Sequence, residues 1–160
     1  MTNEHGRWVW PYLETSPYFI RHAVASFYVR NMRHVVEVGG GKTPVGPYLP
    51  ERCCYQNIDL LGGQDINLIS LKPFRKLAES GSLAVVALGV ESYSDNLLKL
   101  SQLARVSVLE CATQWICQSS FSKLVNQLPL PTHKIDLYID DSDYGQREMW
   151  IWTEQKNEME

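Results

Sequence analysis

The sequence lacks a long apolar run and an excess of positive charge. No stretch reaches the roughly 18 apolar residues that a membrane-spanning helix needs, so we expect no membrane partner. The formal net charge is −3. That charge offers no basic surface for phosphates, so we expect no nucleic-acid partner. The N-terminal residues mix charged and aromatic side chains and do not resemble a signal peptide, so we expect a cytoplasmic protein.

Patterns typical of a metal site are missing as well. The cysteines are Cys53, Cys54, Cys111 and Cys117, and the histidines are residues 5, 22, 34 and 133. Adjacent Cys53 and Cys54 lack the spacer of a metal knuckle, and no two histidines have metal-ligand spacing. We interpret the cysteines as buried thiols in a reducing compartment. Asp140, Asp141 and Asp143 stand together in a predicted hairpin turn, where solvation explains them better than a bound cation. We predict no metal site.

Apolar side chains, by contrast, are plentiful. They make up 44% of the 160 residues, which is enough to build one domain, 1–160, around a core. Residues 1–15 form an arm rich in aromatic side chains, and residues 154–160 form a charged tail that we expect to fray. The arm has no evident place in the core of a sheet. Aromatic side chains are enriched where subunits meet, so we expect a homodimer in which the arm or the first helix borders a neighbouring cleft.

Periodicity and turn signals predict alternating helices and strands. Ser16 and Pro17 begin a helix that ends near Asn31, and Thr43 and Pro44 begin a short one. Further helices are expected at Pro73–Glu79, after the N-cap Ser94, and at Cys117–Leu128. The expected strands are His34–Val38, Cys54–Asp59, Asp65–Ile69, Leu83–Leu88, Val106–Leu109, a segment around Ile135 to Ile139, and Arg147–Thr153. These elements predict an α/β fold with a doubly wound, mostly parallel seven-stranded sheet that ends in an antiparallel hairpin.

The most informative segment is a short apolar strand that ends in Glu37 and the glycines 39–41. The next predicted strand ends in a second acid, Asp59. A glycine loop after a parallel strand lets a ligand approach the backbone, and an acid ending the next strand can bind a ribose hydroxyl pair. The pattern therefore indicates a nucleoside-containing ligand. Two plainer interpretations stay open: Glu37 capping N–H groups of its own loop, and Asp59 forming an ordinary turn.

A triphosphate-binding loop is a further alternative, because Gly41-Lys42-Thr43 ends like a Walker motif. That motif needs a glycine five residues before Gly41, and Val36 occupies the position. Pro44 would also remove an N–H near the phosphates. We therefore disfavour this alternative.

The order Glu37-x-Gly39-x-Gly41, then Asp59, then a strand ending in Val90-Glu91 resembles the class I S-adenosylmethionine-dependent methyltransferases, most closely their small-molecule branch. The resemblance covers roughly Arg33 to Thr153. It implies a Rossmann-like fold and S-adenosylmethionine as cofactor. The chain departs from the family pattern at Thr43, where a third glycine is common, and at Ser92, where many relatives carry histidine.

The resemblance implies roles for individual residues. Cofactor binding falls to Glu37, Gly39, Gly40, Gly41, Asp59, Leu60, Gly89 and Val90, and we add Tyr18 and Arg21 from the first helix, which could close over the methionine end. Candidates for a catalytic base or for substrate binding are Glu91, Tyr93 and Glu110. Methyl transfer itself needs mainly alignment, and a base helps only when the acceptor must lose a proton.

The function predicted from the sequence is methyl transfer from S-adenosylmethionine to a small molecule. Two alternatives share the cofactor. One is an enzyme that transfers the aminocarboxypropyl arm, or that eliminates or cyclises it. The other is an inactive methyltransferase-like binding protein, which the departures at Thr43 and Ser92 would suit.

Overall fold

The computed structural model describes residues 17–41, 44–90, 92–113, 118–142 and 145–153. Several expectations fall outside these ranges: those for the arm and the tail, and those for Ser16, Thr43, Glu91, Cys117 and Asp143.

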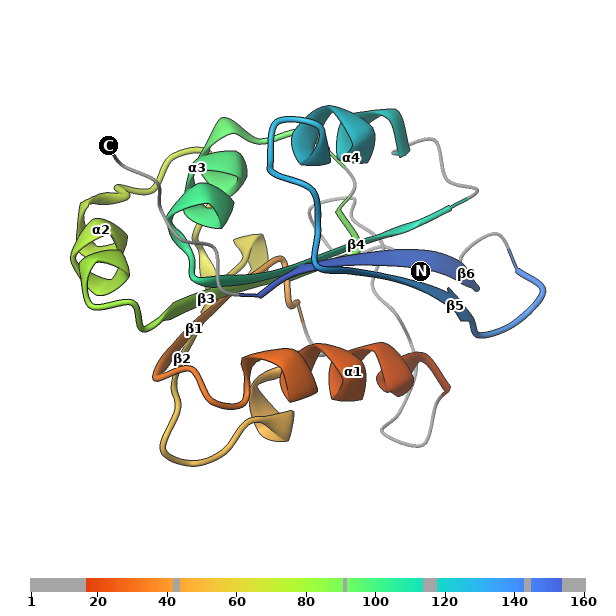
Figure 1. Ribbon diagram of the computed structural model, residues 1–160, viewed down its shortest axis with the longest axis horizontal. Coiled ribbons are helices and arrows are strands. Elements are labelled where there is room, and N and C mark those ends of the chain that lie inside the picture. Colours follow the sequence, from red (N-terminus) through yellow and green to blue (C-terminus); the bar gives the residue numbers. More distant parts are fainter. Residues whose placement is uncertain (1–16, 42–43, 91, 114–117, 143–144, 154–160) are drawn as a thin grey trace.

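A six-stranded mixed sheet forms the centre of the molecule (Figure 1). The strands are β1 His34–Val38, β2 Cys54–Ile58, β3 Leu83–Leu88, β4 Val106–Ala112, β5 His133–Tyr138 and β6 Gln146–Trp152, in the order β2-β1-β3-β4-β6-β5. The first four strands run parallel, and β6 is antiparallel to both β4 and β5. The α/β class and the antiparallel C-terminal hairpin are therefore confirmed.

The prediction of a seventh strand at Asp65–Ile69 is wrong. This segment forms a turn, in which the Asp65 side chain accepts a hydrogen bond from Asn67 N at 2.9 Å and the Asp65 carbonyl accepts one from Leu68 N. The Asn96 side chain then donates to the carbonyls of Ile66 at 2.7 Å and Ile69 at 3.3 Å. An aspartate side chain can offer the backbone a local alternative to a strand ladder, which explains why alternating apolar residues did not produce a strand here.

Helices cover both faces of the sheet (Figure 1). They are α1 Ile20–Val29, α2 Lys72–Glu79, α3 Asp95–Leu103 and α4 Gln118–Val125, with 3-10 turns η1 Pro17–Phe19, η2 Gly46–Tyr48 and η3 Leu60–Gly62. α1 lies on one face, and α2, α3 and α4 lie on the other. The predicted cap of α3 is confirmed, because Leu97 N donates to Ser94 Oγ at 3.2 Å. Among the described residues between the glycine loop and β2, the η2 turn forms in place of a longer helix, which Pro50 would interrupt.

Alternating side chains divide the core into two layers. Val85, Leu109 and Trp152 pack toward α2, α3 and α4, whereas Val86 and Ile151 pack toward α1. Every residue of β3 is buried, as expected for a central strand that is covered on both faces. Within the described part of the chain, no helix combines the length and the apolar character required to cross a bilayer.

One edge of the sheet gathers the carboxyl ends of β1 to β4 and the first residues of β6. The chain moves outward from β1 to β2 and then returns to β3 on the other side of β1. Ligands of open α/β sheets bind outside the carboxyl ends of the strands, at the point where the strand order reverses in this way. The loops after β1, β2 and β3 therefore define where a functional site is to be sought.

Candidate functional site

The glycine loop after β1 adopts a conformation that favours glycine. Gly39 and Gly41 have φ values of 77° and 57°, in the left-handed region that side chains of L-residues rarely occupy. Gly39 is exposed, and a Cβ built on it would have no other atom within 4 Å. The loop thus presents bare backbone and open space at the reversal point.

Asp59 is joined directly to this loop. Its Oδ2 accepts a hydrogen bond from Gly41 N at 3.1 Å, and its Oδ1 accepts one from Leu61 N at 2.8 Å. Asn57 makes a similar link, because its Oδ1 accepts from Gly40 N at 3.1 Å. The structure therefore brings the glycine loop, Asp59 and the following Leu60 together at the ends of two neighbouring strands. The turn interpretation of Asp59 also holds, since its side chain caps η3.

Glu37 is turned inward, below the loop. The side chain is 1% exposed, and its Oε2 accepts hydrogen bonds from Val45 N at 2.7 Å and from the Tyr55 hydroxyl at 2.5 Å. Burial raises the pKa of Glu37 to about 7, although the bonds from Tyr55 and Val45 and the charge of Arg21 act in the opposite direction. The bond from Val45 N agrees with the interpretation of Glu37 as a cap for its own loop.

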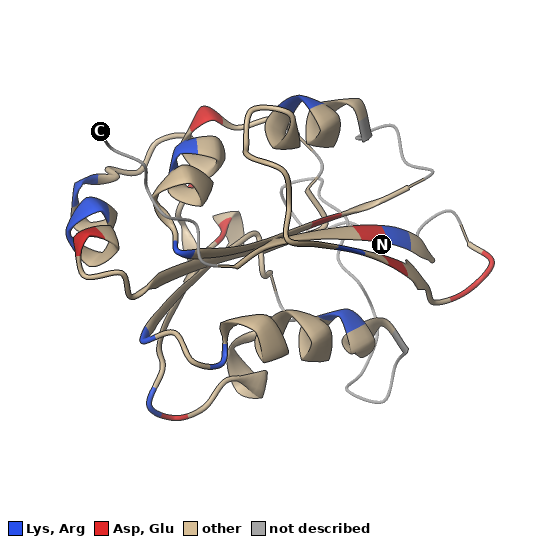
Figure 2. Ribbon diagram, viewed as in Figure 1, with Lys and Arg blue, Asp and Glu red and all other residues tan. Residues whose placement is uncertain are grey.

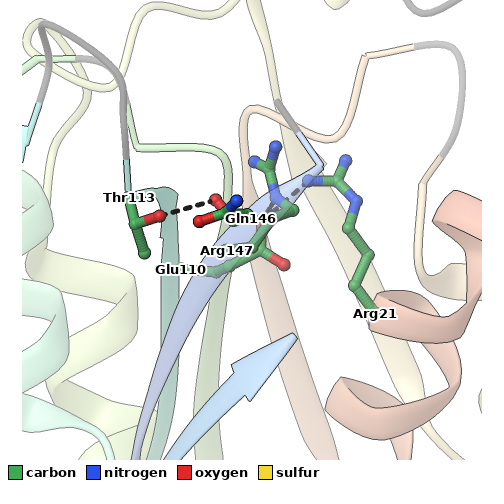
Figure 3. Close-up of polar contacts among 5 residues, drawn as sticks. All are labelled: Arg21, Glu110, Thr113, Gln146 and Arg147. Carbon is green, nitrogen blue, oxygen red and sulfur yellow. Dashed lines mark hydrogen bonds and ion pairs between the residues drawn. The ribbon is translucent and has the colours of Figure 1, made fainter. Parts of the chain in front are cut away.

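A second polar group lies beside the first, where β3, β4 and β6 meet α1. Glu110 Oε1 contacts Arg21 Nη1 at 2.8 Å and Arg147 Nε at 2.6 Å (Figure 3). Glu110 is 0% exposed, and the two arginines are 4% and 3% exposed. Figure 2 shows other charged residues on helices, on connecting loops and on the β5–β6 hairpin. Among the charged residues described, Glu37 is the other one that is buried to this degree.

The two arginines decide the charge of Glu110. Burial by itself raises the pKa of the Glu110 carboxyl, but the charges and hydrogen bonds of Arg21 and Arg147 outweigh it and hold the pKa below its ordinary value. A carboxylate that is held ionised in this way binds a proton weakly. Glu110 is therefore a poor general base.

The backbone of Gly89 and Val90 lies beside the Glu110 side chain and its two arginines. Both backbone N–H groups donate to the Glu110 carbonyl, at 3.0 Å and 2.8 Å. Gly89 has a φ of 80°, and a Cβ on it would stand 3.4 Å from Arg147 Nη2 and 3.8 Å from Arg21 Nη1. The loop after β3 thus passes directly over the two guanidinium groups.

Tyr18 reaches toward the β5–β6 hairpin, where its hydroxyl lies 3.1 Å from Ser142 Oγ. Desolvation raises the pKa of Tyr18, and the nearby Asp140 adds to this effect. Tyr18 and Arg21 therefore lie on the side of β4 and β6, while the glycine loop and Asp59 lie on the side of β1 and β2. Arg21 connects the glycine-loop side with the Glu110 side, because its charge lowers the pKa of both Glu37 and Glu110.

Tyr93 does not join either group. Its hydroxyl donates to Asp95 Oδ1 at 2.8 Å and accepts from Gln127 Nε2 at 3.2 Å, while Lys123 Nζ lies 4.1 Å from the centre of its ring. The hydrogen bond to Asp95 raises the pKa of Tyr93, and the bond from Gln127 acts in the opposite direction. Together the contacts hold Tyr93 beside α3 and α4, on the face opposite Arg21. The third candidate, Glu91, lies outside the described residues.

Arg147 and Tyr55 were not identified from the sequence. A signal for Arg147 did exist, because the residues of β6 alternate and Arg147 shares its buried face with Met149 and Ile151. An arginine on the apolar face of a strand indicates a buried charge that needs a partner. Tyr55 carried no such signal, because tyrosine is an ordinary residue of a half-buried strand.

Among the residues that the structure describes, no three histidine, cysteine, aspartate or glutamate side chains gather closely enough to hold a metal ion. In the comparisons with known proteins, no family model matches the chain. No curated protein has a significantly similar sequence.

The buried Glu37 should make folding stability depend on pH. The folded protein binds a proton on the Glu37 carboxyl more tightly than the unfolded chain does. The protonated carboxyl therefore makes its full contribution to the free energy of unfolding below pH 4.5, and this contribution is lost as the pH rises through about 7. The loss is roughly 3 kcal/mol by the usual conversion of a pKa difference. Glu37→Gln keeps a neutral acceptor at every pH, so its stability should not show this decline between pH 4.5 and 7.

Urea unfolding at several pH values measures the effect, and Glu79→Gln, at an exposed position of α2, is the control. Because the pKa of Glu110 is lowered, this residue changes the folding stability only below pH 4.5, outside the range between pH 4.5 and 7 in which Glu37 is tested. If the free energy of unfolding changed with pH in the same way for the wild type and Glu37→Gln, the raised pKa of Glu37 would be contradicted.

Proposed function

We propose that this protein is an S-adenosylmethionine-dependent methyltransferase that acts on a small molecule. The observation that carries the proposal is the hydrogen bond between Gly41 N and Asp59 Oδ2, which joins the glycine loop to the acid of the next strand. The two residues are separated by 18 positions and meet at the reversal point of the strand order. A glycine loop and an acid in this arrangement suit a nucleoside ligand.

The residues around this bond fit the cofactor. The loop at Gly39 is open on its outer side, which leaves space for a ligand against the backbone. Asp59 would accept from the ribose hydroxyls, and Leu60 and Leu61 would lie beside the adenine. When bound, the cofactor supplies a methyl group on a sulfonium centre. Because Glu37 is buried and already bound to Val45 and Tyr55, we assign it to holding the loop rather than to contacting the ligand.

The sheet supports the same proposal. A mostly parallel sheet with an antiparallel hairpin at its C-terminal end agrees with the arrangement that the methyltransferase resemblance implies. We propose a Rossmann-like methyltransferase fold in which the turn at residues 65–69 replaces one edge strand. Cys53 and Cys54 are free thiols, which suits the reducing cytoplasm as the place of action. The expectation that the cysteines are buried holds for Cys111 but is wrong for Cys54, which is exposed, and for Cys53, which is half-buried.

The described side chains favour an acceptor that needs no strong base. Glu110 is held ionised by two arginines, and Tyr93 lies on the other face of the sheet. Transfer then depends on alignment of the acceptor atom, the methyl group and the sulfur. We therefore propose an acceptor atom that is already nucleophilic near neutral pH.

Asp59→Ala tests the cofactor site. The variant should bind S-adenosylmethionine and S-adenosylhomocysteine more weakly by about 1.5–3 kcal/mol, the scale for losing hydrogen bonds to a charged group. Titration calorimetry measures this difference. Asp65→Ala is the matched control, because Asp65 also accepts a hydrogen bond from the N–H two residues later but lies beyond η3.

Unchanged affinity in Asp59→Ala would remove the ribose assignment. If the cofactor binds, product analysis separates the enzymatic alternatives: S-adenosylhomocysteine marks methyl transfer, and methylthioadenosine marks chemistry on the aminocarboxypropyl arm. Binding without turnover of any acceptor would favour a binding protein instead.

Gly39→Ala tests the loop. A side chain at the left-handed φ of Gly39 costs about 1–2 kcal/mol in strain and projects into the space proposed for the cofactor. The variant should fold with somewhat lower stability but lose cofactor binding. Gly81→Ala should lose similar stability and bind normally, because Gly81 has a similar φ of 68°, also with open space, at the opposite edge of the sheet. Equal binding by the two variants would show that the loop is not the cofactor cradle.

We also propose that the active form is a homodimer whose interface includes α1. Ile20 and Phe27 are 54% and 56% exposed, and they stand two turns apart on the same side of that helix. Light scattering should give a dimer for the wild type and a smaller mass for Phe27→Ser. Leu130→Ser, which changes a 93% exposed apolar residue elsewhere, should leave the dimer intact. A monomeric wild type would contradict this proposal.

A further inference from the structure

The outer edge of β5 offers unpaired backbone groups to another strand. β5 lies at the end of the sheet, and among the strands that the structure describes it pairs with β6 alone. The hydrogen bond from Ile139 N to Gly145 O at 2.7 Å continues the β5–β6 register. Since hydrogen-bonded and non-hydrogen-bonded pairs alternate along an antiparallel ladder, Ile135 bonds to β6, whereas Lys134 and Asp136 turn their N–H and C=O groups outward. Such an edge is a template for pairing with a further chain.

The side chains of the outward residues are exposed and carry opposite charges. Lys134 Nζ lies 3.8 Å from the centre of the Trp150 ring. Asp136 stands opposite Glu148 in the β5–β6 register, and like charges opposite each other on a sheet are destabilising. Within the described residues, neither of these acids forms an ion pair. The edge thus carries a carboxylate that lacks a cation, two residues away from a lysine.

Charge decides how two such edges can pair. In an antiparallel pair of identical strands, the outward residues of one copy stand opposite the outward residues of the other. Centring the pair on Lys134 or on Asp136 sets like charges against each other, and centring it on Leu137 leaves Asp136 opposite Tyr138 without a cation. Centring it on Ile135 sets Lys134 of each copy opposite the partner's Asp136. Opposite charges then meet twice, and each Asp136 gains the cation that its own chain does not provide.

The face of β5 that is turned to α1 supports the same pairing. Ile135 and Leu137 are half-buried there and pack against the apolar layer under the sheet. Pairing centred on Ile135 sets the two isoleucines against each other and Leu137 against the partner's His133, which covers their exposed remainder. The ring of Tyr28 in α1 lies 5.6 Å from the ring of His133. α1 therefore borders this edge, in agreement with a dimer interface that includes that helix.

We propose that two copies of this chain pair through antiparallel β5 strands, with Lys134 of each copy opposite the partner's Asp136. This inference rests on the homodimer proposed above and adds the strand, the register and the charges that join the copies. The two sheets continue into one, and the outward pairs exchange about four backbone hydrogen bonds. The pairing ends at Thr132, because its N–H already donates to the Ile151 carbonyl at 2.8 Å.

Charge reversal tests the pairing, with sedimentation measured at several protein concentrations in low salt. Asp136→Lys sets lysines against each other at both pairs, so the dissociation constant of the dimer should rise at least about tenfold. Glu79→Lys is the matched control, because it makes the same change of charge at an exposed position of α2 and should leave the dimer intact. The double variant with Lys134→Asp and Asp136→Lys restores opposite charges and should restore the dimer.

Amide hydrogen exchange of the wild type is a second measurement, which needs no variant to fold. In the dimer the N–H groups of Lys134 and Asp136 are bonded to the partner, so their exchange should slow as the protein concentration rises through the dissociation constant. The N–H of Ile135 is the internal control, because it bonds to β6 and should be protected at every concentration.

Four results would overturn the pairing. They are a monomeric wild type, a dimer of Asp136→Lys as tight as that of the wild type, a folded double variant that stays monomeric, and outward N–H groups that exchange equally fast at all concentrations.

Two comparisons separate this inference from the earlier proposals. A dimer that Phe27→Ser dissociates and Asp136→Lys leaves intact keeps the α1 interface and overturns the strand pairing. Wild type that binds S-adenosylhomocysteine, with an unaffected dimer in Asp136→Lys, keeps the methyltransferase and overturns the pairing. A dimer that Asp136→Lys breaks and the double variant restores, without binding of S-adenosylhomocysteine, does the reverse.

Discussion

The buried contacts of Glu110 with Arg21 and Arg147 join α1, β4 and β6, and much of the structure depends on them. Breaking a buried ion pair by removing one partner costs several kcal/mol, because the remaining charge is left without compensation. α1 must therefore lie where Arg21 reaches β4, and the hairpin must enter β6 where Arg147 does so. The ion pairs set the position of α1 and of the hairpin relative to the loops of the proposed site.

The two acids of the opening motif perform different physical tasks. Glu37 turns inward from a buried strand, where loss of solvation raises its pKa to about 7 and its oxygen holds Val45 and Tyr55. Asp59 stays at the edge of the sheet, where its two oxygens connect neighbouring loops. One acid shapes the loop from below, and the other borders the open side where a ligand would lie. The motif alone does not distinguish these tasks, because both residues are carboxylates at the ends of strands.

Much of the fold could be predicted from the sequence, because apolar periodicity and turn residues act locally. The bounds of β1 and β3 agree with prediction, and so does the cap of α3 at Ser94. The strand expected at residues 65–69 failed because Asp65 and Asn96 offered its backbone other hydrogen bonds. Asn96 is distant in the chain, so the pattern of residues 65–69 could not reveal its effect.

The candidate site also has a part that could be predicted from the sequence and a part that could not. The sequence by itself determined the glycine loop and the acid after β2, since left-handed backbone and strand ends leave a local signature of glycines and a terminal aspartate. Only the tertiary structure decided that Arg147 meets Glu110, 37 residues earlier, and that Arg21 comes to the same oxygen from another layer. It also decided that Tyr93 turns toward α4, away from that group. Burial and the pairing of charges from separate elements determine these contacts, and both arise only when the sheet and its helices pack together.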